Sequence, residues 1–216
     1  MRFLQRLLAA WLLGLAGVLA GCASPSLVEG RDYVVLDTPQ PTAGGTAIEV
    51  SEFIWFGCPH CADMHPRMET WKRNQPADVA VRIRPVVFRD SWSHGARLHY
   101  TLEAMDELQA RAGAVFEAVQ LDDLDLGNEE AVVAWAIRQG LDRERFLTAY
   151  RSPGVESRIA EAVRVARDYQ LTGVPSFVVD GRYLTSNRLS GSAQDTLAIV
   201  DRLIVKSRAE RQSRRP

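Results

Sequence analysis

The sequence predicts an α/β domain that is interrupted by an all-helical insertion. An apolar, strand-like run at 48–56 leads directly into Cys58-Pro59-His60-Cys61 and a helix-like stretch, and strand character returns only at 174–179. Between these segments, from 93 to 170, the apolar residues recur with helical spacing. A helical block of that length between strands is large enough to form a subdomain of its own.

The composition is that of a soluble globular protein with one folded unit, or one unit that carries an insertion. Of the 216 residues, 46% are apolar and 25% are charged, which is ordinary for a chain that buries a sizeable core. The first 21 residues contain Arg2 and Arg6 and no acid, so 24 of the 26 basic side chains remain against 27 acidic ones from Cys22 onward. This balance argues against nucleic-acid binding, which needs a basic face.

Residues 1–21 have the pattern of an export signal. A positive start precedes an almost wholly apolar run from Leu7 to Ala20, which is shorter than the roughly 20 residues of a membrane-spanning helix. The run ends in Leu19-Ala20-Gly21-Cys22, which resembles the lipobox of bacterial lipoproteins and so implies cleavage before Cys22 and a diacylglycerol on its sulfur. Ordinary signal cleavage after Ala23 is the alternative. Either route places the mature protein outside the cytoplasm, with residues 22–31 as a tether.

Three strands are predicted in the first part of the chain. Residues 33–36 are rich in β-formers, 48–56 reads as a strand buried on both faces, and 79–88 alternates apolar with basic residues. Glu52 is the departure inside the buried strand. If it is buried, its pKa is raised and it could exchange protons with Cys61. The alternative is that Glu52 points to solvent at a strand edge.

Cys58 and Cys61 stand at the predicted start of the helix that follows this strand. Two thiols three residues apart on a first helical turn can close a small disulfide ring. The unpaired N–H groups and the helix dipole at that position favour the Cys58 thiolate, and His60 can add positive charge or a hydrogen bond. Half of a zinc site, with His60 or His65 as a further ligand, and two inert buried thiols are the alternatives.

Only three cysteines occur in the chain, at 22, 58 and 61. If Cys22 is used elsewhere, the remaining pair leaves no cysteine for a structural disulfide. The chain is long enough to fold on a hydrophobic core, so it does not need the Cys58–Cys61 pair as a staple. The pair therefore indicates chemistry.

Helical periodicity covers most of the remaining chain. The helix after Cys61 carries a core stripe and contains Pro66, which we expect to kink it. Asn128 and Asp142 are predicted N-caps, and Ser152-Pro153 starts a long helix. The predicted inward residues of these helices are core rather than cofactor contacts: Met64, Met68 and Trp71; Leu98, Leu102 and Met105; Val132, Trp135 and Ala136; Val155, Ile159, Val163 and Ala166.

The last part of the chain returns to the sheet. Asp180-Gly181 is a strong hairpin signal between the 174–179 strand and Arg182-Tyr183-Leu184. Ser192 and Asp195 form a cap for a final helix. Residues 207–216 are basic and polar, and we expect a solvated, frayed tail.

With these segments in order, the sequence resembles the DsbA-type thiol:disulfide oxidoreductases of the thioredoxin superfamily, over nearly everything from Tyr33 to Lys206. The most specific matches are the residues from Phe53 to Cys61 and from Thr172 to Phe177, and Pro-His between the cysteines is typical of that family. The resemblance implies a thioredoxin fold in two parts, at 32–90 and 152–206, separated by a helical insertion at 91–151.

The resemblance also implies roles for individual residues. Cys58, followed by Pro59, would be the exposed attacking and attacked sulfur, and Cys61 the buried resolving sulfur. His60 would stabilise the Cys58 thiolate, and Glu52 would assist proton movement at Cys61. Pro175 would be a cis proline beside the disulfide, with Val174 offering backbone hydrogen bonds to an extended substrate chain.

A member of this family would introduce disulfides into reduced exported proteins in the periplasm, without a cofactor other than its own disulfide. The implied partners are those clients, a membrane DsbB-type protein that reoxidises the pair, and a membrane reached through lipidated Cys22. We expect a monomer. A thiol reductase or a disulfide isomerase on the same fold is the rival enzyme, although family isomerases carry a dimerisation domain for which residues 22–33 are too short. A zinc-binding envelope protein without enzymatic activity is the rival from another class.

Overall fold

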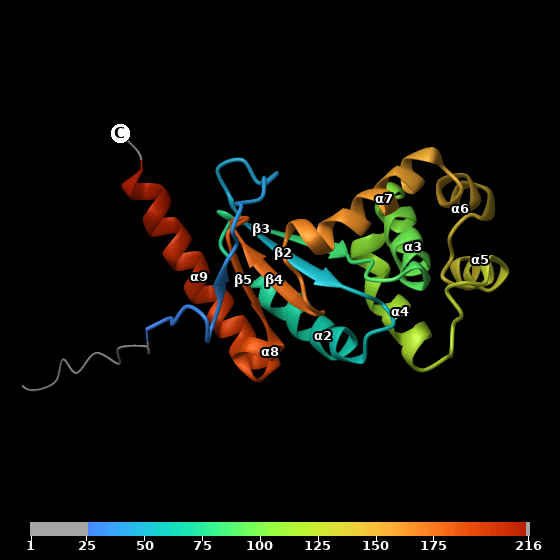
Figure 1. Ribbon diagram of the computed structural model, residues 1–216. Coiled ribbons are helices and arrows are strands. Elements are labelled where there is room, and N and C mark those ends of the chain that lie inside the picture. Colours follow the sequence, from blue (N-terminus) through green and yellow to red (C-terminus); the bar gives the residue numbers. More distant parts are fainter. Residues whose placement is uncertain (1–25, 215–216) are drawn as a thin grey trace, which may run out of the picture.

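The computed structural model describes residues 26–214, so the predicted signal segment and Cys22 lie outside the described residues. Within this part of the chain a five-stranded mixed sheet has the order β1-β5-β4-β2-β3 (Figure 1). The strands are β1 (Val34–Val35), β2 (Ile48–Ile54), β3 (Val79–Pro85), β4 (Ser176–Val179) and β5 (Tyr183–Ser186). Strands β2 and β3 pair in parallel, whereas the other neighbours are antiparallel.

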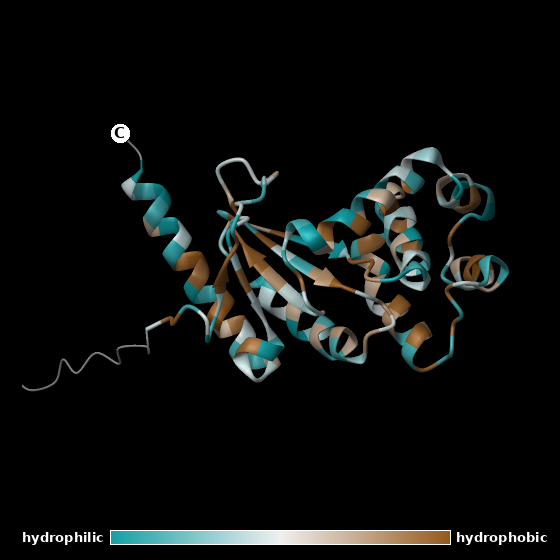
Figure 2. Ribbon diagram, viewed as in Figure 1, coloured by the Kyte–Doolittle hydropathy of each residue, from teal (hydrophilic) through white to brown (hydrophobic). Residues whose placement is uncertain are grey.

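Helices cover both faces of the sheet, and the interior strand β2 is buried along its whole length. On one face, α2 (Pro59–Arg73) and α9 (Ala193–Ser213) share a cluster with the strands that includes Val50, Met68 and Leu203. On the other face, the end of α7 (Pro153–Asp168) packs on Phe53 and Val178. Figure 2 shows the hydrophobic residues concentrated on the strands between these helices.

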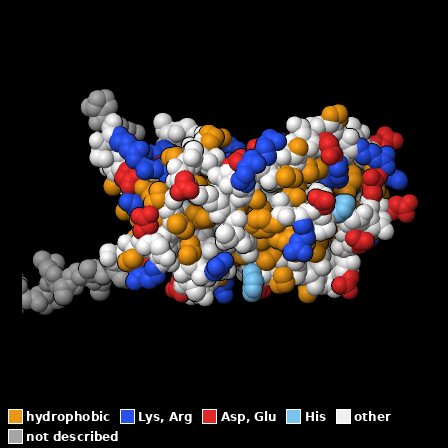
Figure 3. Space-filling view, in the orientation of Figure 1, with side chains coloured by type: hydrophobic (Ala, Val, Ile, Leu, Met, Phe, Trp, Pro, Cys, Tyr) orange, Lys and Arg blue, Asp and Glu red, His pale blue; other side chains and the backbone are white. Residues whose placement is uncertain are grey.

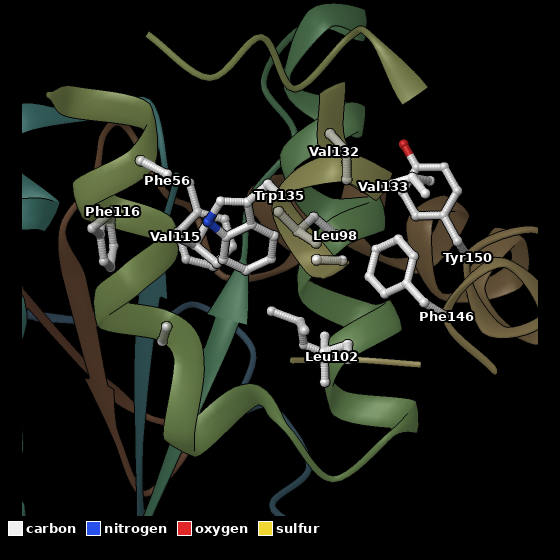
Figure 4. Packing of buried hydrophobic residues seen from close by; sticks show 14 of the residues in the cluster. Phe56, Leu98, Leu102, Val115, Phe116, Val132, Val133, Trp135, Phe146 and Tyr150 are labelled. Atoms are coloured by element: carbon white, nitrogen blue, oxygen red, sulfur yellow. The ribbon is translucent and has the colours of Figure 1, made fainter. Parts of the chain in front are cut away.

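The predicted helical insertion is present between β3 and α7. It consists of η1 (Asp90–Trp92), α3 (Ser93–Ala104), α4 (Leu108–Gln120), α5 (Glu129–Arg138) and α6 (Arg143–Tyr150). Its side chains form one hydrophobic cluster, in which Trp135 lies between the side chains of α3 and α4 (Figure 4). Ile54, Phe56 and Cys61 belong to the same cluster, so the insertion and the CxxC segment share a core.

The predicted helix starts are confirmed by cap geometry. The side chains of Asn128, Asp142 and Ser152 accept hydrogen bonds from backbone N–H groups three residues ahead, at 3.1, 2.8 and 3.2 Å. Ser192 and Asp195 cap α9 as expected. The Asp180-Gly181 turn joins β4 and β5 with positive φ angles of 57° and 63°, as a tight hairpin requires.

The predicted inward stripe of α7 is wrong at Val163, whereas Ala166 is partly buried against the cluster of Phe53 and Val178, as expected. Val163 is 52% exposed, and Ala162 and Val165 are buried instead, together with Val155 and Ile159. The first half of the helix packs against α3 and the second half against the sheet, and the buried stripe follows both neighbours. A buried stripe predicted for a single packing partner therefore fails where the second partner begins.

The predicted frayed tail is also wrong, because α9 continues to Ser213. The last turns of α9 contact β5 and the turn between β4 and β5. Glu210 accepts hydrogen bonds from the Tyr183 hydroxyl at 2.7 Å and pairs with Arg182 and Lys206, while Arg211 pairs with Asp180. Apart from Lys206, these partners lie far away in the sequence, so the polar segment 207–213 gains structure that its composition alone does not indicate.

Candidate active site

The CxxC segment lies where β2 leaves the centre of the sheet and α2 begins. Cys58 is the N-cap of α2, with φ −91° and ψ 116°, and Pro59 occupies the first helical position, where its missing N–H costs nothing. The Cys58 N–H donates to the Trp55 carbonyl at 2.9 Å, which fixes the turn. Gly57 is required in this turn, because a Cβ there would lie 2.4 Å from the Trp55 ring.

The two thiols have opposite electrostatic surroundings. The pKa of Cys58 is lowered from 9.0 to about 6, chiefly by a hydrogen bond from the Cys61 thiol and then by the backbone N–H groups of Cys61 and His60, against a partial burial that raises it. The imidazole of His60 is the last contributor among these causes. Burial raises the pKa of the Cys61 thiol far above its usual range. Only Cys58 is therefore a thiolate near neutral pH.

A second loop, at the start of the neighbouring strand β4, faces Cys58. The Val174–Pro175 peptide bond is cis, as the resemblance implied, and β4 begins directly after it. When it is protonated, the Cys58 thiol donates to the Val174 carbonyl, over a sulfur–oxygen distance of 3.6 Å. The Ser176 hydroxyl donates to the Gly173 carbonyl at 2.7 Å and so braces the loop. Residues 116 positions apart thus meet at the reactive sulfur.

Glu52 is buried beneath this pair, with 2% of its surface exposed, which excludes the alternative of a solvent-facing strand edge. It lies on β2 opposite Phe177 of β4 and Ile83 of β3. Burial, and then the charge of Glu69, raise its pKa from 4.5 to about 8. Glu52 also adds to the rise in the pKa of Cys61, so the two groups interact. Near this buried sulfur, the neutral carboxyl of Glu52 can give a proton and the ionised carboxylate can take one back.

Known proteins resemble this chain over most of its length. The family model described as a DSBA-like thioredoxin domain matches residues 49–198. The chain is 36% identical to the thiol:disulfide interchange protein DsbA of Azotobacter vinelandii, over 95% of this chain and 97% of that protein. The DsbA of Pseudomonas aeruginosa is also 36% identical, over 83% of this chain and 85% of that protein. The chain belongs to the DsbA-like thioredoxin family.

Solved structures agree with this assignment. The crystal structure of Pseudomonas aeruginosa DsbA superposes with a TM-score of 0.82 at 34% identity, covering 86% of this chain and 97% of that one. Neisseria meningitidis NmDsbA3 gives a TM-score of 0.74 at 29% identity, covering 86% and 100%. The α/β thioredoxin fold with a helical insertion is therefore confirmed, and this DsbA-like chain is a thiol:disulfide oxidoreductase.

Sequence reasoning missed a second buried carboxylate on the same strand of this DsbA-like chain. Glu49 is 1% exposed and accepts hydrogen bonds from Ser51 at 2.8 Å, the Ala43 N–H at 2.9 Å and Arg84 at 3.1 Å. Burial acts to raise its pKa, but these partners outweigh burial and hold the pKa below its usual value. Strand alternation puts Glu49 on the sheet face opposite Glu52, so it stabilises the fold away from the thiols. The sequence signal for this carboxylate was the pair of basic residues Arg82 and Arg84 on β3, since both form ion pairs with Glu49.

Two cavities differ in their distance from the thiols. One of about 480 Å³ lies against Val174 and Pro175, and polar side chains of His60, Asp63 and Arg188 also line it. A larger groove of about 1200 Å³ runs along β3 and α7 and does not touch the thiols. The first cavity includes Val174, whose carbonyl oxygen lies 3.6 Å from the Cys58 sulfur.

The zinc alternative requires a group of metal ligands near the thiols. In the described part of the chain, no three His, Cys, Asp or Glu side chains are grouped as metal ligands, and His65 packs on Phe116 with ring centres 5.3 Å apart. No helix among residues 26–214 is long and apolar enough to cross a bilayer.

Proposed function

We propose that this chain donates disulfide bonds to reduced exported proteins, with the Cys58–Cys61 disulfide as the donor. The contrast between the two thiols supports the oxidising direction. A group with a pKa of about 6 is about nine-tenths ionised at pH 7, whereas Cys61 stays protonated. A stabilised Cys58 thiolate favours the reduced protein and so makes the oxidised protein the stronger oxidant.

The exchange follows from this asymmetry. A client thiolate attacks the Cys58 sulfur, a bond forms between the two sulfurs, and the Cys58–Cys61 bond breaks. Cys61 leaves with the electron pair and takes a proton. The client's second thiolate then attacks the client sulfur of the mixed disulfide, and Cys58 leaves as its stabilised thiolate. The client loses two electrons and two protons in total, and the Cys58–Cys61 pair is reduced.

The surrounding residues have supporting roles in this proposal. Glu52 has a pKa of about 8, so it is neutral at pH 7 and supplies the proton that Cys61 takes. Pro59 begins the helix whose N–H groups face the Cys58 sulfur, and His60 adds a smaller favourable charge. Val174, with Pro175 behind it, presents its backbone to the client chain at the reactive sulfur.

The cellular setting is also proposed. DsbA homologues are periplasmic, and we place this chain in that compartment, held to a membrane through a lipid on Cys22. Its clients are reduced exported proteins, and a membrane DsbB-type protein reoxidises Cys58 and Cys61. No cofactor beyond the disulfide is required, and the chain acts as a monomer. Mass analysis of the mature N-terminus tests the anchor, because a diacylated Cys22 and cleavage after Ala23 give different masses.

The direction of exchange is tested by equilibrating the pair with glutathione buffers and by comparing two assays. We expect a redox potential well above the about −270 mV of thioredoxin. We also expect faster recovery of a reduced, unfolded protein than reduction of insulin. The matched control is Cys58→Ser, which removes the attacked sulfur. A potential near that of thioredoxin, together with efficient insulin reduction, would show a reductase instead.

A further inference from the structure

Beside the reactive sulfur lies a row of aromatic side chains, Trp55, Trp92 and Phe88, which we call the aromatic shelf. The rings of Trp55 and Trp92 stack at 4.1 Å with 3° between their planes, and Phe88 meets Trp92 edge-on at 5.3 Å. The Arg89 guanidinium lies 5.5 Å from the centre of the Trp92 ring. These residues come from the end of β2 and from the connection between β3 and α3.

The shelf is continuous with the site of exchange. The Trp55 ring lies against Gly57, the residue before Cys58. The Trp55 carbonyl accepts a hydrogen bond from the Cys58 N–H. Trp55 and Val174 pack against the same hydrophobic cluster, which contains Trp92. Val174 in turn accepts the hydrogen bond of the Cys58 thiol. Ring contacts therefore lead from the Cys58–Val174 contact outward to Phe88.

The outer end of the shelf is open. Phe88 is 39% exposed, although it lies only three residues beyond the end of β3 and follows the buried residues Val86 and Val87. Figure 3 shows hydrophobic side chains gathered on the middle of one face, where the sheet meets the insertion. A single exposed aromatic ring is unremarkable on its own. Its continuity with the reactive sulfur is what indicates a function.

We propose that the aromatic shelf binds an aromatic side chain of the client chain, close in sequence to the cysteine that reacts. This inference rests on the proposed exchange at Cys58. A client joined to that sulfur passes Val174 as an extended chain, which advances about 3.3 Å per residue. The ring centres from Trp55 to Trp92 and from Trp92 to Phe88 are 4.1 and 5.3 Å apart. With this advance per residue, we expect the bound ring roughly two to four residues from the client cysteine.

The chemistry favours an aromatic partner over an aliphatic one. Phe88 offers a ring edge and face to an incoming ring, and aromatic pairs gain from offset or edge-to-face contact in addition to burial. We therefore expect the shelf to set the preference of the protein among clients, while its reactivity toward small thiols depends on Cys58 alone.

The test uses reduced dithiol peptides that carry Phe or Ser at two, three or four positions on either side of a cysteine. The second-order rate constant of their oxidation is measured with the full chain, Phe88→Ser and Ile137→Ser. Ile137 is the matched control, because it is 46% exposed but lies on α5, at the far end of the insertion from α2 (Figure 1). Dithiothreitol serves as the small-thiol reference.

We expect the unmodified chain to oxidise the best Phe peptide about five- to tenfold faster than its Ser counterpart. Phe88→Ser should reduce that ratio to within about twofold, whereas Ile137→Ser should retain it. Reaction with dithiothreitol should be equal in all three. No preference at any position, or an equal slowing of Phe and Ser peptides by Phe88→Ser, overturns the inference.

Failure of the oxidase proposal is distinguishable from failure of the shelf. If the chain is a reductase, it reduces the oxidised peptides, and that reverse reaction passes through the same mixed disulfide at Cys58. The Phe-to-Ser ratio measured in the reverse direction then tests the shelf by the same criterion.

Discussion

The buried carboxyl of Glu52 should weaken the fold as the pH rises, and Glu52→Gln should remove that weakness. In the folded protein the pKa is about 8, whereas 4.5 is the ordinary value. Between pH 4.5 and about pH 8, Glu52 is therefore protonated in the folded protein and ionised in the unfolded chain. The stabilising contribution is complete below about pH 4.5 and is lost as the pH rises through about 8.

The size of the effect follows from the same two values. Stability falls by about 1.4 kcal/mol per pH unit across this window, which amounts to about 3 kcal/mol at pH 7 and about 5 kcal/mol above pH 8. The side chain of Gln is neutral at every pH and has nearly the same shape. The Glu52→Gln variant should therefore match the unmodified chain near pH 5 and exceed its stability by about 3 kcal/mol at pH 7.

Urea unfolding of the oxidised protein at pH 5, 7 and 8.5 measures this difference, since neither cysteine titrates while the disulfide is closed. Equal m-values would show that the surface exposed on unfolding is unchanged. Parallel stability curves across this range would refute the assignment of a proton to Glu52. Glu49→Gln is the control on the other face of β2. It removes an ionised partner of Arg84, so it should destabilise the fold by about 1–3 kcal/mol at pH 7.

Three further changes test other parts of the structure. His60→Ala should raise the pKa of Cys58 only slightly, because backbone N–H groups contribute more than the imidazole; a large rise in an ultraviolet titration of the thiolate would contradict this order. Gly57→Ala should slow exchange with dithiothreitol and lower the unfolding midpoint, because its Cβ would lie 2.4 Å from the Trp55 ring, and unchanged values would mean that this turn yields easily. Truncation after Lys206 should lower the free energy of unfolding by about 1–3 kcal/mol through loss of the Glu210 contacts, whereas a frayed tail would cost nothing.

Local patterns were sufficient for most of the secondary structure. Side-chain caps such as Asn128 and Asp142 act within three residues, so their signal is complete in the sequence. The thiol pair and its place at a helix start are likewise local. The meeting of Cys58 with Val174, 116 residues away, could be expected only from the resemblance to a known family.

The errors share one physical cause, which is a partner distant in the sequence. Val163 was assigned to the core because one neighbour was assumed for α7, which in fact has two. Glu49 was missed because Arg84 is 35 residues away in the sequence, and only the pairing of β2 with β3 brings the two side chains together. The end of α9 looked unstructured because its ion-pair partner Asp180 belongs to a hairpin.

The sharing of one core by Cys61 and the insertion limits how this protein can be shortened. Leu98, Val115 and Trp135 belong to the cluster that also contains Cys61. A minimal version in which a short loop replaces 91–151 would hydrate Cys61 and bring its acidity closer to that of Cys58. The difference between the two sulfurs would shrink, and the trimmed protein would exchange disulfides with less bias. The inserted helices are thus part of the redox chemistry, although none of them carries a cysteine.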